Sequence, residues 1–176
     1  ARTEPVEIDA VSMGWITSGR TAYDNKGNPV RQYEPYFSDS DAYEVESEIR
    51  NHGVTPELFY DALGRNVRTE LPNGTAIRVV FGTWHQESFD ANDTVLEPWS
   101  SGAAGCPWYV AKIAKASTHP DRLAAVAAAE HANTPAVVKL DALGRPYQNE
   151  STDGDAYASG DGNIDRDGFL YRAETV

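Results

Sequence analysis

The strongest candidate for a chemical site is an acidic segment near the C-terminus. In residues 163–174, oxygen-bearing side chains stand at positions 1, 3, 5 and 12, and a glycine stands at position 6. This is the spacing of an EF-hand loop, in which oxygen ligands surround Ca²⁺. Against it, the first position is Asn rather than Asp, and residues 151–162 do not suit an entering helix. Calcium is therefore a candidate cofactor, beside the expectation of none, and its ligands would be Asn163, Asp165, Asp167 and Glu174.

Nucleophilic catalysis has few candidates in this sequence. The single cysteine, Cys106, would need a general base and an oxyanion donor. His119 or His131 would have to supply the base, but no catalytic motif surrounds either residue. None of the four histidines has the spacing of a zinc-binding pair. We therefore expect Cys106 to be a buried thiol, His131 to lie at a helix end, and the chain not to be an enzyme.

Aromatic residues suggest a third chemistry. Four tryptophans and nine tyrosines are enough to form a sugar-stacking face. Large side chains on a pleated sheet more often pack across strands, however, and no obvious acid/base pair accompanies them. The alternative function that follows from these residues and the acidic segment is a calcium- or carbohydrate-binding acidic β-module.

Composition narrows the class of protein. The chain has 176 residues and a net charge of −12. This acidity argues against nucleic acid and anionic membrane surfaces as direct partners, because both repel a negative protein. No apolar run approaches the roughly 18 residues of a membrane-spanning helix, and no signal peptide is visible. One cysteine also excludes an internal disulfide framework.

A repeated turn is the most informative feature of the sequence. Four segments share an apolar residue, Asp, two free positions, Gly, two free positions, Val or Tyr, and then Arg or Gln. Asp at the first turn position accepts backbone hydrogen bonds, and Gly three residues later permits left-handed backbone, so the pattern predicts a tight hairpin. Residues 89–93 resemble a degenerate fifth copy without the glycine. The turn residues are Asp24 and Gly27, Asp61 and Gly64, Asp141 and Gly144, and Asp165 and Gly168.

Other segments supply strands and helices. Strands are predicted at residues 10–17, 66–71 and 75–81, and in the last of these Ile77, Val79 and Phe81 alternate as in a half-buried strand. The alanine-rich residues 120–132 predict a helix with Ser117 or Thr118 as its N-cap. A weaker helix is predicted at 43–51, and residues 97–115 predict an ordered loop followed by a short helical turn.

These elements define a mainly β fold in which antiparallel hairpins form a meandering sheet with one alanine-rich helix. We divide the chain into a repeat β-segment at residues 1–96, a loop-and-helix insertion at 97–135, and a second repeat β-segment with the acidic loop at 136–176.

The signature Tyr-Asp-x-x-Gly-Arg at residues 60–65 resembles the YD or RHS (rearrangement hot spot) repeat. More specifically, the chain resembles the B component of bacterial insecticidal toxin complexes (Tc toxins), which is related to the plasmid-virulence B family. Matching blocks run nearly end to end, at residues 18–21, 25–37, 53–56, 60–65, 71–75, 84–86, 90–96, 131–135 and 140–145.

The resemblance implies a role as well as a fold. In that family, YD repeats build a β-sheet strip that spirals into a hollow shell around a cytotoxic effector. The chain would then be a structural, non-catalytic segment of the wall, in contact with neighbouring RHS-repeat segments, the C component and the enclosed effector polypeptide. The complex would be made in the bacterial cytoplasm and secreted. Because the chain is much shorter than a complete family member and starts abruptly, we expect an internal fragment.

Overall fold

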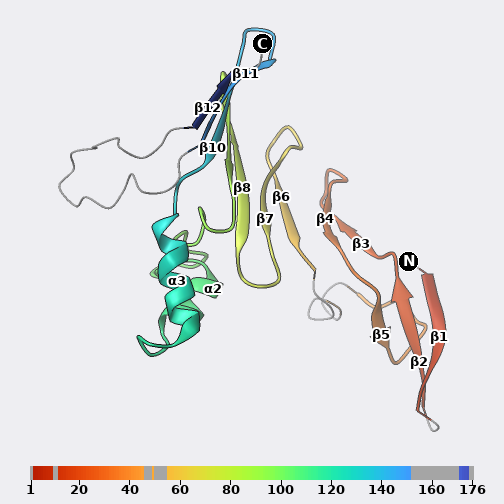
Figure 1. Ribbon diagram of the computed structural model, residues 1–176. Coiled ribbons are helices and arrows are strands. Elements are labelled where there is room, and N and C mark those ends of the chain that lie inside the picture. Colours follow the sequence, from red (N-terminus) through yellow and green to blue (C-terminus); the bar gives the residue numbers. More distant parts are fainter. Residues whose placement is uncertain (1, 10–11, 46–48, 50–54, 152–170, 175–176) are drawn as a thin grey trace. The chain divides into compact units, whose positions relative to one another are not determined.

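The computed structural model describes residues 2–9, 12–45, 49, 55–151 and 171–174, with side chains described from residue 14 to residue 151 (Figure 1). The chain divides into two compact units, residues 1–66 and residues 67–176. Each unit is mainly antiparallel β, as the sequence predicts. No helix in the described part of the chain is both long and apolar enough to cross a membrane.

The first unit contains two groups of antiparallel strands. One group has the order β1-β2-β5, and the other has the order β6-β4-β3. Tyr33, Tyr36 and Ile49 form its buried core, and the two tyrosine rings meet edge to face at 6.4 Å. The helix predicted at 43–51 falls largely outside the described residues. The strands are β1 (Arg2–Asp9), β2 (Ser12–Ser18), β3 (Thr21–Tyr23), β4 (Pro29–Gln32), β5 (Tyr36–Ser38) and β6 (Glu57–Tyr60).

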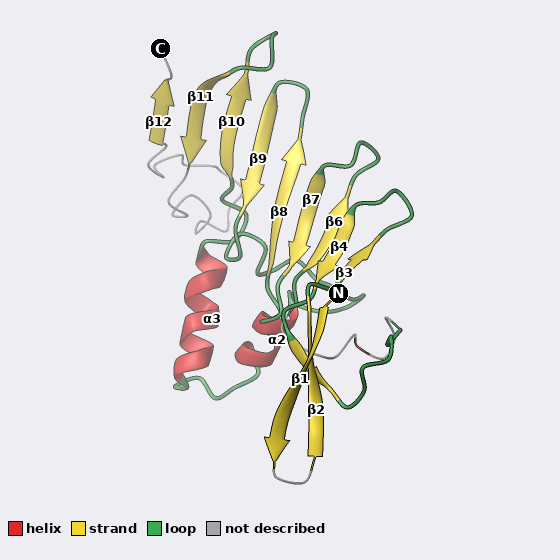
Figure 2. Ribbon diagram, turned by 90° about the vertical axis from the view of Figure 1, so that its right-hand side faces the viewer, coloured by secondary structure: helices red, strands yellow, loops and turns green. Residues whose placement is uncertain are grey.

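The second unit is a meander in which spatial order follows sequence order. Figure 2 shows its six strands side by side, and each pairs antiparallel with the next across most of the sheet. The sheet does not close on itself. The strands are β7 (Asn66–Glu70), β8 (Ala76–Phe81), β9 (His85–Phe89), β10 (Ala136–Leu140), β11 (Pro146–Ser151) and β12 (Tyr171–Glu174).

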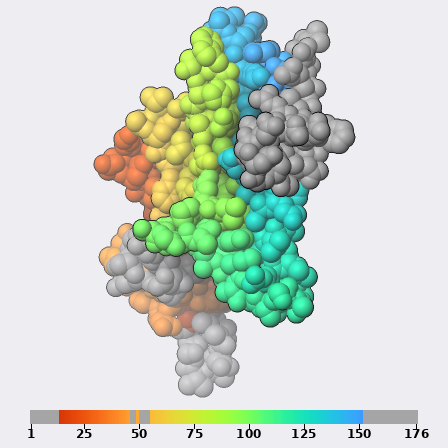
Figure 3. All heavy atoms as spheres, turned by 90° about the vertical axis from the view of Figure 1, so that its left-hand side faces the viewer, coloured from red at the N-terminus to blue at the C-terminus, as the bar shows by residue number. Residues whose placement is uncertain are grey.

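A helical insertion separates β9 from β10. Its loop leads into α2 (Pro107–Ile113), the predicted short helical turn, and then into the alanine-rich α3 (Pro120–Glu130). Figure 3 shows the loop and the helices packed together as one continuous body. Two lysines tie the helices to each other, because Lys112 Nζ lies 3.1 Å from Asp121 Oδ1 and Lys115 pairs with the other oxygen. Hydrogen bonds from Lys115 and Lys112 lower the pKa of Asp121 to about 2.

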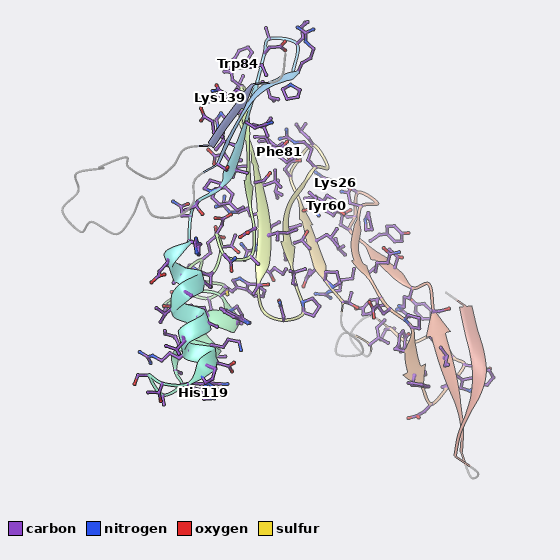
Figure 4. The ribbon with its side chains drawn as sticks, viewed as in Figure 1. Lys26, Tyr60, Phe81, Trp84, His119 and Lys139 are labelled. Carbon is purple, nitrogen blue, oxygen red and sulfur yellow. The ribbon has the colours of Figure 1, made fainter. Side chains whose placement is uncertain are left out.

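The start of α3 differs from the prediction. The N-cap is His119, whose Nδ1 accepts a hydrogen bond from the Asp121 N–H at 3.1 Å, and not Ser117 or Thr118. Pro120 explains the difference, because a proline at the first helical position forces the residue before it into extended backbone. His119 lies at this turn in Figure 4, and His131 is the C-cap at the other end.

The buried face of β8 is not the one that its alternating apolar residues suggest. Ala76 is fully buried, whereas Ile77 is 43% exposed. The insertion covers the face that carries Ala76 and Arg78, since Thr94 of the insertion donates to the Ala76 carbonyl and Glu97 binds Arg78. The alternation of Ile77, Val79 and Phe81 therefore marks one face of the strand, but it does not mark the face that the insertion covers.

Candidate functional site: the repeat turns and the insertion fastening

The described repeat turns share one backbone geometry. At residues 61–65, the Asp61 N–H donates to the Arg65 carbonyl at 3.0 Å and the Gly64 N–H donates to the Asp61 carbonyl at 3.1 Å. Residues 24–28 and 141–145 repeat both bonds at 2.9–3.1 Å. The glycines at the fourth turn position, Gly27, Gly64 and Gly144, have φ of 86°, 79° and 75°. This arrangement is a type I turn followed by a left-handed glycine, which reverses the chain between two strands.

The turn aspartates hold this geometry with their side chains. Asp61 Oδ1 accepts from the N–H groups of Leu63 and Arg65 at 2.8 and 3.0 Å. Its Oδ2 accepts from Arg65 Nε at 2.7 Å, and Asp141 has the same set of contacts with Leu143 and Arg145. In the first copy, an asparagine side chain replaces the arginine and donates to Asp24 Oδ2 at 2.9 Å. The carboxylate thus connects the turn backbone to the first residue after the turn.

These contacts favour the ionised carboxylate. The Asn28 side-chain amide is the main cause of the lowered pKa of Asp24. Backbone N–H groups of Arg65 and Arg145 are the main causes for Asp61 and Asp141, respectively. Hydrogen bonds to the charged form lower a carboxyl pKa for this reason.

Acidification is expected to weaken the turns. Because the folded pKa of each turn aspartate lies below the unfolded value of about 3.9, its stabilising contribution is present above that pH. The contribution is lost as the pH falls through the depressed folded pKa. The melting temperature should fall between neutral pH and pH about 2.5. The fall should be smaller in a double variant that carries Asp61→Asn and Asp141→Asn. Carboxyl titration by NMR with midpoints at or above the unfolded value would contradict this prediction.

Gly64→Val should cost about 1–2 kcal/mol of unfolding free energy, because a side chain disfavours left-handed backbone. The added Cβ would lie 3.5 Å from Asn28 Oδ1, an ordinary contact, so the expected cost is conformational rather than steric. Leu63→Ala is the matched control in the same turn, where the side chain is exposed, and its effect should stay within about 0.5 kcal/mol. Equal denaturation midpoints for the two variants would refute this account of the turn.

A further turn with the same geometry lacks the aspartate. At residues 71–75, Leu71 N–H donates to the Thr75 carbonyl at 2.7 Å and Gly74 N–H donates to the Leu71 carbonyl at 3.0 Å. Asn73 Oδ1 accepts from the Thr75 N–H, and Gly74 has a φ of 83°. This turn joins the strands predicted at residues 66–71 and 75–81, which pair antiparallel as β7 and β8.

The degenerate copy at residues 89–93 behaves differently. Asp90 Oδ1 still accepts from the N–H groups of Asn92 and Asp93, at 2.7 and 3.0 Å. The chain does not return directly to the sheet, because β10, the partner of β9, begins only at Ala136. Asp93 stands where the other copies have glycine, and the chain enters the insertion at this point.

Asp93 closes the insertion, a role that the sequence did not reveal. Its side chain is buried, with the residue 8% exposed, and its Oδ2 accepts from the Asp90 N–H at 2.7 Å. Oδ1 accepts from both the N–H and the hydroxyl of Thr134 at 2.9 Å, and the Asp93 carbonyl accepts from the Asn133 N–H. One residue therefore joins the entrance and the exit of the insertion. The segments containing these residues, 90–96 and 131–135, were visible as matching blocks, but their contact was not.

Hydrogen bonds to backbone carbonyls attach the insertion to the β7–β8 hairpin. Thr94 Oγ1 donates to the Ala76 carbonyl at 2.5 Å, and Trp108 N–H donates to the Gly74 carbonyl at 3.1 Å. Cys106 is fully buried beside Val95, whose carbonyl accepts the Cys106 N–H at 3.0 Å. The thiol thus lies in the packing of the insertion, as expected for a buried cysteine.

The structure describes few of the residues proposed for a metal or sugar site. Asn163, Asp165, Asp167 and Gly168 lie outside the described residues, and only the backbone of Glu174 is described. Across the part of the chain that is described, no group of three or more His, Cys, Asp or Glu side chains could hold a metal ion. Trp99 and Trp108 are half-buried beside Arg68 and Lys112, whereas Trp84 is 58% exposed.

Comparison with known proteins shows which solved structures share this fold. No family model and no curated protein matches the chain. A crystal structure of TcdB2–TccC3 is 22% identical, with a TM-score of 0.60, over 93% of this chain and 6% of that chain. TcdB2–TccC3 without its hypervariable C-terminal region is 24% identical, with a TM-score of 0.54, over 85% and 6%. The Photorhabdus luminescens Tc holotoxin pore is 26% identical, with a TM-score of 0.54, over 80% and 6%.

The chain therefore has the fold of a segment of Tc toxin proteins. The likeness extends over most of its length, and the resemblance predicted from the sequence is confirmed at the level of fold. The chain spans only about 6% of each of these much longer chains.

Proposed function

We propose that the chain is a structural segment of a toxin-encapsulating shell of the RHS-repeat type and carries out no catalysis. The observation that carries the proposal is the fold match to TcdB2–TccC3 over 93% of the chain. An open antiparallel meander suits a wall, because its edge strands can pair with further strands. In this role the functional residues are architectural, namely Asp24, Gly27, Asp61, Gly64, Asp141, Gly144, Asp165 and Gly168.

Contacts between neighbouring hairpins support a wall that gains strength from one repeat to the next. Within the first unit, Tyr60 Oη donates to the Pro29 carbonyl at 2.8 Å, and Lys26 Nζ donates to the Ala62 carbonyl at 3.3 Å. Figure 4 shows Lys26 and Tyr60 on these adjacent hairpins. These two hairpins are thus held by their own turn aspartates and by hydrogen bonds to each other. Such nearest-neighbour coupling makes the stability of a repeat array grow with its length.

The proposal also assigns partners and a location. The partners are neighbouring RHS-repeat segments, the C component of a toxin complex and the effector polypeptide enclosed by the shell. The complex is made in the bacterial cytoplasm and secreted. Support comes from the matched structures, which contain TcdB2–TccC3 and a Tc holotoxin pore.

A graft into a known shell chain tests the proposal. The 176-residue chain would replace the matched segment of a TcdB2–TccC3 chain. We expect electron microscopy to show the same particle and protease to leave any enclosed polypeptide intact. A matched graft carrying both Gly64→Val and Gly144→Val should give fewer intact particles, because both turns are left-handed. A graft that folds locally by hydrogen exchange but yields open, protease-sensitive particles would refute a wall function.

A further inference from the structure

Two arginines stand directly opposite each other beneath the insertion. Arg68 of β7 pairs with Arg78 of β8 in the register of the sheet, so both side chains project from the same face. Their side chains are only 21% and 28% exposed. Like charges directly opposite each other destabilise a sheet, and partial burial weakens solvent screening. The pair therefore requires a counter-charge.

The carboxylate of Glu97 supplies this charge from the loop of the insertion. Its Oε2 accepts from Arg68 Nη1 at 3.0 Å. Its Oε1 accepts from Arg78 Nε at 2.9 Å and lies 2.8 Å from Arg78 Nη2. A carboxylate held by several guanidinium N–H groups is among the stronger charge-assisted contacts in proteins. Glu97 therefore bridges the two strands as well as fastening its own loop.

Aromatic rings hold both guanidinium groups in place. The Arg78 guanidinium carbon lies 3.8 Å from the ring centre of the buried Phe89, which is the cross-strand partner of Arg78 on β9. The Arg68 guanidinium carbon lies 5.5 Å from the ring of Trp99. Stacking on a ring fixes the plane of a guanidinium, so less side-chain freedom is lost when a carboxylate binds.

The formal charges of the cluster cancel. Arg68 also pairs with Glu70, at 3.0 Å from Nε to Oε1. The two arginines are therefore matched by the carboxylates of Glu70 and Glu97. Removal of Glu97 alone leaves one net positive charge between two preorganised guanidinium groups, which favours binding of a small anion with two oxygens.

We propose that Arg68 and Arg78 form a carboxylate-binding site whose resident ligand is the Glu97 side chain, and that this site locks the insertion onto the sheet. When the resident carboxylate is removed, the site binds a free carboxylate such as formate. This inference concerns contacts within the second unit and does not depend on the proposed shell function.

Chemical rescue tests this site. In the 176-residue chain, Glu97→Ala should lower the melting temperature and speed hydrogen exchange at the Trp108 N–H, which bonds to the sheet. Sodium formate at ten times its Kd should raise the melting temperature by about 3–6 °C, whereas sodium chloride at equal ionic strength should not. Glu130→Ala, which removes an exposed glutamate on α3, is the matched control and should show no formate-specific shift.

A second variant separates this site from other anion effects. Glu97→Ala combined with Arg78→Met should lose the formate response, because the bidentate partner is absent. If Glu97→Ala is unfolded without added anion, formate but not chloride should restore a cooperative melt. The proposal is overturned if formate acts no better than chloride on Glu97→Ala. It is also overturned if formate stabilises Glu130→Ala equally, or if the response survives without Arg78.

Discussion

The Asp93→Ala variant is expected to lose about 3 kcal/mol of unfolding free energy. Two backbone donors lose their acceptor at once, namely the N–H groups of Asp90 and Thr134. The Thr134 hydroxyl can still donate to the His131 carbonyl, at 2.8 Å. Because Asp93 is 8% exposed, water has limited access to replace the missing oxygens. Buried donors left unsatisfied cost about 1–3 kcal/mol each, and partial access to water keeps the total below their sum. Urea denaturation of the two proteins measures the difference.

Asn92→Ala is the matched control for this change. It alters the adjacent, exposed side chain and keeps the backbone N–H that binds Asp90, so its effect should stay within about 0.5 kcal/mol. Hydrogen exchange gives a second readout, since Asp93→Ala should expose the Asn133 and Thr134 amides more than those of the β10–β11 hairpin. If the two variants are equally stable, Asp93 does not join the ends of the insertion.

The hairpins were predictable because their determinants are local. The turn at residues 61–65 depends on Asp61, on Gly64 and on hydrogen bonds between residues of the same loop. Repetition of the pattern along the sequence then indicated a meander of hairpins, which is the strand order that the second unit shows. A left-handed turn position can be recognised in a sequence because it is usually occupied by glycine, and few other residues fit there.

The contacts that hold the insertion against the sheet were not predictable in the same way. Asp93 and Thr134 are 41 residues apart, and Arg68 and Glu97 are 29 apart. No periodicity links such residues, and each taken alone has the type of an ordinary surface residue. Local rules also competed at the start of α3, where Ser117 and Thr118 have better capping propensity but Pro120 fixes the cap at His119. Tertiary contacts thus determine how the insertion is attached, and a single proline determines the N-cap of α3. Residue preferences alone predict neither.

The Gly105→Ala variant should lose about 3 kcal/mol of unfolding free energy through a clash rather than through backbone conformation. An added Cβ would lie 2.5 Å from the Val95 carbonyl oxygen and 3.2 Å from Leu96 Cα. Both are backbone atoms, and the Val95 carbonyl is held by the Cys106 N–H at 3.0 Å. The loop and the start of α2 would therefore have to separate, and overpacking of this kind typically costs about 1–3 kcal/mol.

Gly102→Ala, in the same loop, distinguishes this clash from conformational strain. Gly102 has a φ of 81°, and a Cβ added there would meet nothing within 4 Å, so alanine should cost only about 1–2 kcal/mol for left-handed backbone. Circular dichroism melts of both variants provide the comparison. A larger loss at Gly102 than at Gly105 would mean that the loop does not pack against α2. The expected order instead makes close backbone contact the reason that a glycine precedes Cys106, because the buried loop leaves no room for even one methyl group.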